Sequence, residues 1–449
     1  MNSGRVVFIQ WTTNLYGKVC IIVQIHVVQK GQSLFTIGRQ YGIGWQEIAD
    51  ANELGNAGKL AVGQAIVIPI VGSYYWVQPG DTLYEIARRE KMTISELANI
   101  NKISLSAPLT VGQRLYIPPA PKTPAQSLLY VEPRTPVTQV MITETEKRVG
   151  ALTYLAMFSY EVQRDGTLKA PSIANLPTIA ANAGAVNAMV ISNLENFAFS
   201  AGLARDIFMS KGVQDLLFTN ILEVAQRVGY KDIHFDFELL FPEDRQLYNA
   251  FLRRARDRFH PAGLTLSTAL APKVSDVKTG IYGAHDYKAH GEIVDFVSLM
   301  TYEWGYTYSE PQAVSPLPQV ERVVKYAVQE IPRNKIFLGQ NLYGYDWSKP
   351  YPTQGGKPAK ALSPKQATEL AIRENEAISY DYVAQAPFFT YIDNNNVQHE
   401  VWFEDARSIQ AKFDLLKKYS LRGIMYWKLG LAFPQNWLLL ESNFNIVKK

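Results

Sequence analysis

The sequence predicts an α/β protein in which a (β/α)8 TIM barrel with an α+β insertion follows two small βααβ modules. Three observations support this fold class. A chain of 449 residues is longer than one ordinary hydrophobic core can use, so we expect two or three domains. The N-terminal quarter contains an internal repeat. From Leu128 onward, apolar runs typical of strands alternate with stretches of helical periodicity.

The composition indicates a folded protein and excludes several kinds of partner. Hydrophobic residues make up 47% of the chain and charged residues 19%, as in ordinary globular proteins. The formal net charge of +4 is too small over this length to argue for nucleic acid, although weak attraction to an anionic polymer such as cell-wall material is permitted. No apolar run approaches the ~20 residues that cross a bilayer, so we expect no membrane span.

The residues that usually hold metals and cofactors are sparse. Cys20 is the single cysteine, so we expect neither an intrachain disulfide nor a cysteine-based metal site. The six histidines are not paired at ligand spacing, and the sequence therefore predicts neither a metal nor a cofactor. The oligomeric state has no signature in the sequence and stays open.

Residues 1–22 form an extension of uncertain nature, either an upstream addition or an expression artefact. Their short apolar patch, Val6–Ile9, is followed by polar residues, whereas a secretory signal needs a longer apolar centre and a small-residue cleavage site. We recognise no signal peptide there. If the protein works outside a cell, we expect it to arrive by another route.

The internal repeat has a constant offset of 49 residues. Val27–Leu34 corresponds to Trp76–Leu83, and Asn52 corresponds to Asn101. A constant offset over a whole module requires no gaps, which makes chance similarity very improbable. Each unit is predicted to contain a short strand, a Gly turn, two helices and a closing strand. In the second unit, Thr82 or Asp81 can cap the first helix, and Thr93 with Glu96 can form a capping box on the second.

The two units resemble LysM domains over residues 26–70 and 75–119. The resemblance lies in the opening V-Q-x-G-[QD]-[ST]-L, the central Asn and the closing V-G-Q-x-[LI]-x-I-P. It implies binding to glycans that contain N-acetylglucosamine, namely peptidoglycan, chitin and their oligomers. We expect the two units together to bind polymer more tightly than either alone. The alternative is that both are spacers. A Pro-rich linker is predicted over residues 120–127.

Eight strand-like runs with helices between most of them predict the barrel over residues 128–449. The seventh connection is long, and the sequence predicts an inserted α+β subdomain at about 344–421, with a polar, strand-rich stretch at Asp381–Phe403. The runs are Leu128–Glu132, Leu152–Tyr160, Asn187–Ser192, Asp232–Glu238, Thr265–Ala271, Phe296–Tyr302, Lys335–Tyr343 and Gly423–Lys428.

The fourth run carries the most informative pattern. Side chains alternate along a strand, so His234, Asp236 and Glu238 share one face. The apolar set on the other face must face the surrounding helices, which leaves the polar set directed into the barrel. Burial of two carboxyls and an imidazole costs several kcal/mol unless they pair, and folding gains nothing obvious from it. We therefore expect a functional reason. The apolar set is Ile233, Phe235 and Phe237.

This strand resembles that of glycoside hydrolase family 18, whose signature there is D-x-x-D-x-D-x-E. Asp236 and Glu238 match the last two acidic positions, whereas Lys231 and His234 replace the first two. A further departure is Ser192–Glu195, which stands where the family has S-x-G-G. Other segments that resemble the family are Met300–Glu303, Leu342–Trp347 and Gly423–Trp427.

The resemblance implies a substrate-assisted, retaining mechanism without a carboxylate nucleophile. Glu238 would be the general acid, and Asp236 would hold the N–H of the substrate's 2-acetamido group. Tyr302 would hydrogen-bond the acetamido oxygen, and Trp427 would form the floor under the reacting sugar.

Four further residues are candidates for the site. We expect His234 to donate an N–H to Asp236 and keep it ionised, although a lone histidine is more often a satisfied core residue. Trp304, Tyr343 and Asn341 could contact the substrate or could equally be packing residues.

The predicted function is hydrolysis of β-linked N-acetylglucosamine bonds in peptidoglycan. Two LysM-like units before a family 18-like barrel with D-I-H-F-D-F-E resemble the spore-germination N-acetylglucosaminidases that act on cortex fragments. That resemblance implies a place at the spore coat or cortex surface, in association with the cell wall. The alternatives are a chitinase and a non-catalytic, glycan-binding barrel. Internal against chain-end cleavage, and intact cortex against fragments, stay open.

Overall fold

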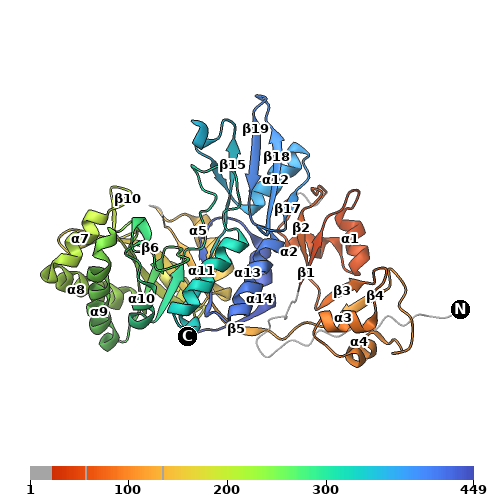
Figure 1. Cartoon of the computed structure of the whole chain (residues 1–449), viewed down its shortest axis with the longest axis horizontal. Coiled ribbons are helices and arrows are strands. Elements are labelled where there is room, and N and C mark those ends of the chain that lie inside the picture. The colour runs from red at the N-terminus through yellow and green to blue at the C-terminus, as the bar shows by residue number, and fades with distance from the viewer. Residues whose placement is uncertain (1–22, 56–57, 134–135) are drawn as a thin grey trace.

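The computed structural model describes residues 23–55, 58–133 and 136–449, and the extension at residues 1–22 lies outside them. Figure 1 shows the parts in chain order: two small modules, a barrel ringed by helices, and a sheet that projects beyond one end of the barrel. The predicted fold class, a TIM barrel with an α+β insertion after two βααβ modules, is confirmed.

Each repeat is a two-stranded antiparallel sheet with two helices between its strands. The predicted caps are present, since Thr82 accepts from the Glu85 N–H and Thr93 forms a capping box with Glu96. The first repeat comprises β1 (Gln24–Val27), α1 (Leu34–Tyr41), α2 (Trp45–Ala51) and β2 (Ala65–Ile68). The second comprises β3 (Ser73–Trp76), α3 (Leu83–Arg89), α4 (Ile94–Asn101) and β4 (Arg114–Ile117).

The central asparagine of each repeat ties its second helix to its closing strand. The Asn52 side chain donates to the carbonyls of Ile48 and Val67 and accepts from the Val67 N–H. Asn101 makes the corresponding bonds to Leu97 and Tyr116. These bonds satisfy backbone groups that two-stranded sheets would otherwise leave open, which explains an Asn at this point of both repeats.

All eight predicted runs form parallel strands of one closed barrel. Each strand pairs with the next, and the last pairs with the first, so the barrel has no open edge among these strands. The strands are β5 (Thr123–Val131), β6 (Tyr154–Val162), β8 (Val186–Ser192), β11 (Asp232–Asp236), β12 (Thr265–Leu270), β13 (Phe296–Leu299), β14 (Ile336–Asn341) and β20 (Gly423–Trp427).

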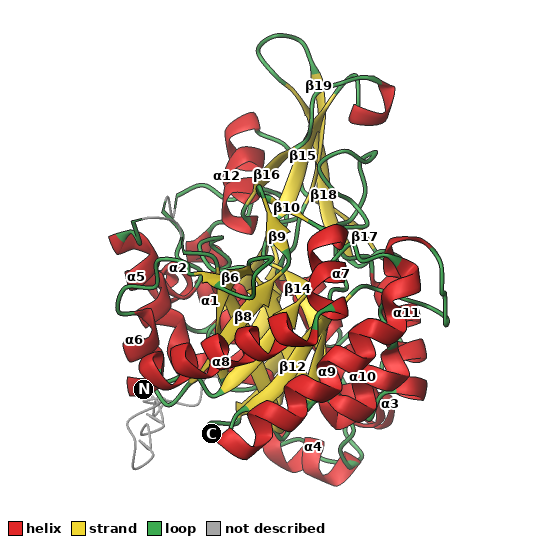
Figure 2. Cartoon of the chain, turned by 90° about the vertical axis from the view of Figure 1, so that its left-hand side faces the viewer, coloured by secondary structure: helices red, strands yellow, loops and turns green. Residues whose placement is uncertain are grey.

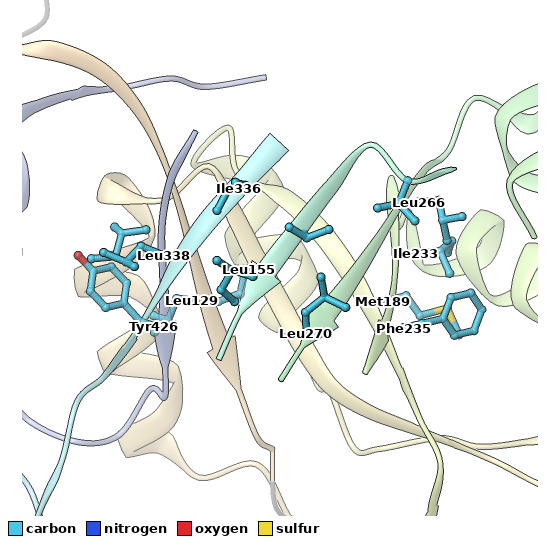
Figure 3. Packing of buried hydrophobic residues seen from close by; sticks show 14 of the residues in the cluster. Leu129, Leu155, Met189, Ile233, Phe235, Leu266, Leu270, Ile336, Leu338 and Tyr426 are labelled. Carbon is cyan, nitrogen blue, oxygen red and sulfur yellow. The ribbon is translucent and has the colours of Figure 1, made fainter. Parts of the chain in front are cut away.

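Helices surround these strands, as Figure 2 shows. Alternate side chains of each strand point outward into the main hydrophobic core, part of which is drawn in Figure 3. Ile233, Phe235 and Phe237 of the fourth strand belong to this core, as predicted. The helices are α5 (Gln139–Arg148), α6 (Leu176–Asn182), α7 (Ala201–Met209), α8 (Lys211–Val228), α9 (Arg245–Phe259), α10 (Tyr287–Ile293), α11 (Leu317–Glu330), α13 (Ala406–Tyr419) and α14 (Pro434–Asn443).

The insertion is a five-stranded antiparallel sheet with one helix. The prediction that it extends to residue 421 is wrong, because α13 packs Ile409 and Phe413 into the main barrel core. The helix before the eighth strand is therefore the barrel's own, and the inserted segment ends before Ala406. Its elements are β15 (Gly344–Ser348), β16 (Lys360–Leu362), α12 (Pro364–Glu374), β17 (Ser379–Asp381), β18 (Ala386–Ile392) and β19 (Gln398–Trp402).

The predicted linker at 120–127 is shorter than expected. Strand β5 already begins at Thr123, because its first residues pair with β21 (Phe444–Ile446) near the C-terminus. Pro124 fits there since it lies at the start of the strand, outside the pairings of β5 with the neighbouring barrel strands.

Within the three described ranges, no helix combines the length and apolar character that a membrane crossing requires.

Closure of the barrel depends on a glycine at the start of its last strand. A Cβ on Gly423 would lie 1.9 Å from the backbone oxygen of Gln126 on β5, so Gly423→Ala must push the two strands apart. We expect a loss of about 2 kcal/mol and a Tm lower by several degrees in thermal unfolding followed by circular dichroism. Gly212→Ala on α8 is the matched control, since its Cβ meets no described atom within 4 Å. An equal Tm for the two variants would contradict the tight closure.

Candidate active site

A cavity of about 790 Å³ opens at the carboxyl ends of the barrel strands. This is the end of a TIM barrel where catalytic residues are found. Six of the eight predicted site residues line it: Asp236, Glu238, Tyr302, Trp304, Tyr343 and Trp427.

Asp236 and Glu238 lie at and just beyond the end of β11. Burial raises the pKa of both carboxyls, and the neighbouring charge of Asp236 raises the pKa of Glu238 further. Glu238 therefore keeps its proton at a pH where an exposed glutamate has lost it. Oxygen Oδ1 of Asp236 is buried and has no hydrogen-bond donor among the described residues. The pair thus combines a proton donor with an unsatisfied acceptor.

The backbone of Glu238 is held by a residue that sequence reasoning missed. The Asn193 side chain accepts from the Glu238 N–H through Oδ1 and donates to the Glu238 carbonyl through Nδ2, each across 2.9 Å. Asn193 is fully buried and follows the last residue of β8. The signal was the departure at residues 192–195, which the sequence analysis noted as a difference from the family without assigning it a use.

A histidine in the loop before α10 holds the same turn. His285 accepts from the Ala271 N–H at Nδ1, so its Nε2 carries the proton and donates to the Phe237 carbonyl across 3.0 Å. The next residue but one, Leu239, has a φ of 52°, in the left-handed region. The chain that carries Glu238 is therefore fixed on both sides at a point where the backbone turns sharply.

The predicted contact between His234 and Asp236 is wrong. His234 Nδ1 lies 2.7 Å from Ser267 Oγ and Nε2 lies 2.5 Å from the Tyr130 hydroxyl, so both ring nitrogens are occupied. Ser267 donates its own proton to Asp232, and its oxygen therefore accepts from His234 Nδ1. The ring points across the barrel to β5 and β12 instead of along β11. His234 is fully buried below the cavity and does not line it.

This arrangement fixes the proton of Tyr130. Burial lowers the pKa of His234 to about 3, so the ring is neutral and its unprotonated Nε2 accepts from Tyr130. Tyr130 itself lines the cavity, and its hydroxyl proton is directed at His234, which does not. Tyr130 was also missed, since an apolar run around it suggested packing alone.

Trp427 is held by rings from the first two barrel strands. Its ring centroid lies 4.9 Å from that of Phe158 and 5.4 Å from that of Tyr130, both edge-on. These edge-on contacts fix the plane of the indole ring. One face of the ring stays available to the cavity, which Trp427 lines.

A third carboxyl, Glu303, lines the cavity beside the predicted residues. It accepts from the hydroxyls of Tyr343 and Tyr345, and burial raises its pKa. The Tyr343 hydroxyl therefore donates its single proton to Glu303. Glu303 has a φ of 68°, so strand periodicity could not predict where its side chain points.

Asn341 proves to be a packing residue, the alternative that the sequence left open. It is fully buried, and its Nδ2 donates to the Tyr343 carbonyl across 2.6 Å. Gln340 donates to its Oδ1. Asn341 therefore shapes the turn after β14 and is not among the cavity residues.

No group of three or more His, Cys, Asp or Glu side chains in the described part of the chain is placed to hold a metal ion.

Comparison with known proteins agrees with this geometry. The cortical fragment-lytic enzyme of Bacillus subtilis (strain 168) is 59% identical over 429 residues, which cover 95% of this chain and 99% of that protein. The crystal structure of the spore cortex-lytic enzyme SleL of Bacillus megaterium QM B1551 matches with a TM-score of 0.88 at 50% identity, over 96% of this chain and 100% of that one. The putative sporulation-specific glycosylase YdhD of Bacillus subtilis is 33% identical over 431 residues, which cover 94% of this chain and 99% of that protein.

Family models give the same assignment. The LysM domain model matches residues 26–69 and 75–118. The model of glycosyl hydrolases family 18 matches residues 149–432, more than half of the chain, and includes the whole cavity apart from Tyr130. The chain therefore belongs to glycosyl hydrolase family 18, as a glycosidase with two LysM domains at its N-terminal end.

Proposed function

We propose that this enzyme cleaves β-linked N-acetylglucosamine bonds in spore-cortex peptidoglycan, with retention of configuration and assistance from the substrate's own acetamido group. One observation supports this most directly: Oδ1 of Asp236 is buried at the cavity and lacks a donor within the described residues. A buried acceptor left unpaired costs about 1–3 kcal/mol. The amide N–H of a 2-acetamido sugar is a donor that would satisfy it.

The reaction follows from the placement of the carboxyl pair. Glu238 donates its proton to the glycosidic oxygen while the acetamido oxygen attacks C1, which breaks the glycosidic bond and forms an oxazolinium ion. Asp236 accepts from the acetamido N–H and stabilises the positive charge that develops on the ring. Tyr302 donates to the acetamido oxygen and sets its direction of attack. Glu238, now ionised, takes a proton from the water that opens the oxazolinium.

The other cavity residues position the sugar. Trp427 offers an indole face for the apolar face of the reacting sugar. The Glu303 carboxylate is bonded to Tyr343 and Tyr345, so it is engaged away from C1 and serves as an acceptor for sugar hydroxyls. A non-catalytic, glycan-binding barrel would not need a carboxyl with a raised pKa at the position of Glu238.

The polymer is proposed from the relatives. The cortical fragment-lytic enzyme at 59% identity and the spore cortex-lytic enzyme at 50% identity both cover nearly the whole chain. The LysM domains add glycan binding and support association with the cell wall, and we propose the spore coat or cortex surface as its place. Chitin is the competing polymer, because its chain also consists of N-acetylglucosamine.

Removal of the general acid should strongly reduce turnover and leave substrate binding intact. Glu238→Gln keeps the shape of the side chain and removes its proton transfer, so we expect kcat to fall about 10²- to 10⁴-fold. The measurement is mass spectrometry of products from cortex fragments and from chitin oligomers, with the exposed Glu292→Gln as the control. A Glu238→Gln enzyme as active as the control would exclude Glu238 as the acid. Cleavage of chitin oligomers but not of cortex fragments would identify chitin, rather than peptidoglycan, as the substrate.

The charge of Asp236 should set the basic limb of the pH profile. Glu238 is active when protonated, so kcat/KM falls as the pH rises through its pKa, which burial and Asp236 raise. Asp236→Asn removes the negative neighbour, and the pKa of Glu238 should drop. We expect the residual activity of Asp236→Asn on a chitin oligomer, whose leaving sugar needs the proton of Glu238, to decline at a lower pH than that of the wild type. An unshifted basic limb would show that the two carboxyls do not interact.

The Asn193 contacts should matter for catalysis more than for binding. Asn193→Asp retains the acceptor for the Glu238 N–H but replaces the donor to the Glu238 carbonyl with a repulsive oxygen. We expect kcat to fall about tenfold or more at a nearly unchanged KM, because the acid is displaced from the glycosidic oxygen. The new carboxylate should also move the basic limb to higher pH, a change that mere loss of stability would not produce. Asn182→Asp on the surface of α6 is the control.

A further inference from the structure

The two LysM domains share one fold but have different surroundings. Their closing turns contain Gly63 and Gly112, with φ of 82° and 83°. A Cβ on Gly63 would lie 1.9 Å from the backbone oxygen of Ile378 in the insertion, whereas a Cβ on Gly112 would meet no described atom within 4 Å. The same turn thus contacts the insertion in the first domain and is open in the second.

The turn of the first domain is bonded both to the insertion and to α13 of the barrel. The Ile378 N–H donates to the Val62 carbonyl across 2.8 Å, and Arg407 donates to the Gly63 carbonyl across 3.1 Å. Ala61 and Ile378 lie in the same small hydrophobic core, beneath the insertion sheet. Ile378 directly precedes β17, so the first domain contacts the insertion at one edge of its sheet.

The first domain also contacts the barrel. Its β2 places Ala65 and Val67 in the main core, next to α13 and α14. Glu53 pairs with Arg148 of α5 across 2.9 Å, and Gln435 of α14 donates to Asn52. Figure 1 shows β2 and α2 in the angle between these helices and β17. One small domain therefore touches both the barrel and the insertion.

The second domain lacks the residues that make these contacts. Lys102 stands where the first domain has Glu53, and Val111 is 61% exposed where Val62 is 42% exposed. The second domain contacts the first, since Gln24 bonds both backbone groups of Tyr74 and Arg114 donates to the Gln40 carbonyl.

The insertion forms one wall of the catalytic cavity. Tyr345 and Ala361 of β15 and β16 line it, and Tyr345 bonds Glu303. The insertion joins the barrel at two chain crossings, near residues 343 and 405, and backbone bonds of Ala359, Lys365 and Ala384 also attach it to barrel residues. The contact at Ile378 adds a fixed point next to β17, at one edge of the insertion sheet.

We propose that the first LysM domain is a brace that holds the insertion against the barrel and so fixes the wall of the active site. This role is separate from glycan binding, and its catalytic consequence rests on the proposed N-acetylglucosaminidase activity. A substrate too short to reach either LysM domain is then hydrolysed at a rate that depends on the contacts of the first domain.

The test compares Gly63→Ala with Gly112→Ala in the full chain. Both replace a turn glycine of nearly equal φ, so the backbone strain is matched and only the collision with Ile378 differs. With an aryl glycoside of an N-acetylglucosamine disaccharide, we expect kcat/KM to fall about tenfold in Gly63→Ala and less than about twofold in Gly112→Ala. Hydrogen exchange should show a faster Ile378 amide, and faster amides in β15, in Gly63→Ala alone.

A second pair of variants tests the brace by a change of charge, which disturbs folding less than a new Cβ at Gly63. Glu53→Lys installs the residue of the second domain opposite Arg148, and Lys102→Glu is its matched control. We expect slower hydrolysis of the disaccharide substrate in Glu53→Lys and recovery in Glu53→Lys with Arg148→Glu, in which the charges are exchanged.

The outcomes separate the brace from the proposed function. Wild-type rates in Gly63→Ala with a fast Ile378 amide would overturn the brace, as would equal effects of the two glycine variants. A wild type that hydrolyses no N-acetylglucosamine bond would overturn the proposed function. In that case the amide exchange rates of β15 would test the brace. Exchange that is faster in Gly63→Ala alone would support it, and unchanged exchange would overturn it.

Discussion

Two carboxyl groups spaced two residues apart on one strand cannot both be ionised once they are removed from water. Asp236 and Glu238 are in this position, and their mutual repulsion makes one proton stay in the pair at a pH where free carboxylates have lost theirs. Much of the cavity can be understood from this constraint. Asn193 and His285 fix the backbone that carries Glu238, so that its proton is presented in one direction.

The polar chain below the pair has a different effect. Asp232, Ser267, His234 and Tyr130 satisfy one another across the barrel interior, so burial of a histidine and a carboxyl costs far less than it would for isolated groups. The chain ends in a tyrosine whose proton points away from the cavity. In the proposed reaction, the acceptor that the cavity offers to the N–H of an acetamido group is therefore Asp236.

Side-chain directions that follow from strand periodicity could be predicted from the sequence. Directions that depend on turns, or on partners far away in the sequence, could not. Alternation on β11 predicted that Ile233 and Phe235 face the helices and that Asp236 and Glu238 face inward. The partners of His234 come from β5 and β12, far away in sequence, so proximity along β11 suggested Asp236 instead. Glu303 and Leu239 have positive φ, and a side chain after such a residue follows no strand pattern. Asn341 continues a buried strand, and its partners come from the turn that follows.

The linkage between the LysM domains and the barrel affects how a polymer is captured. Tethered modules gain affinity through effective concentration, which depends on the reach and stiffness of the connection. Here the first domain is fixed to the barrel, and the second lies between that domain and β5, which begins six residues after β4 ends. Both ends of the second domain are therefore restrained. In the proposed reaction, a glycan held by the second domain would keep a narrow range of orientations toward the cavity. The spacing of the bound strand, rather than the length of a flexible linker, would then determine which bonds reach Glu238.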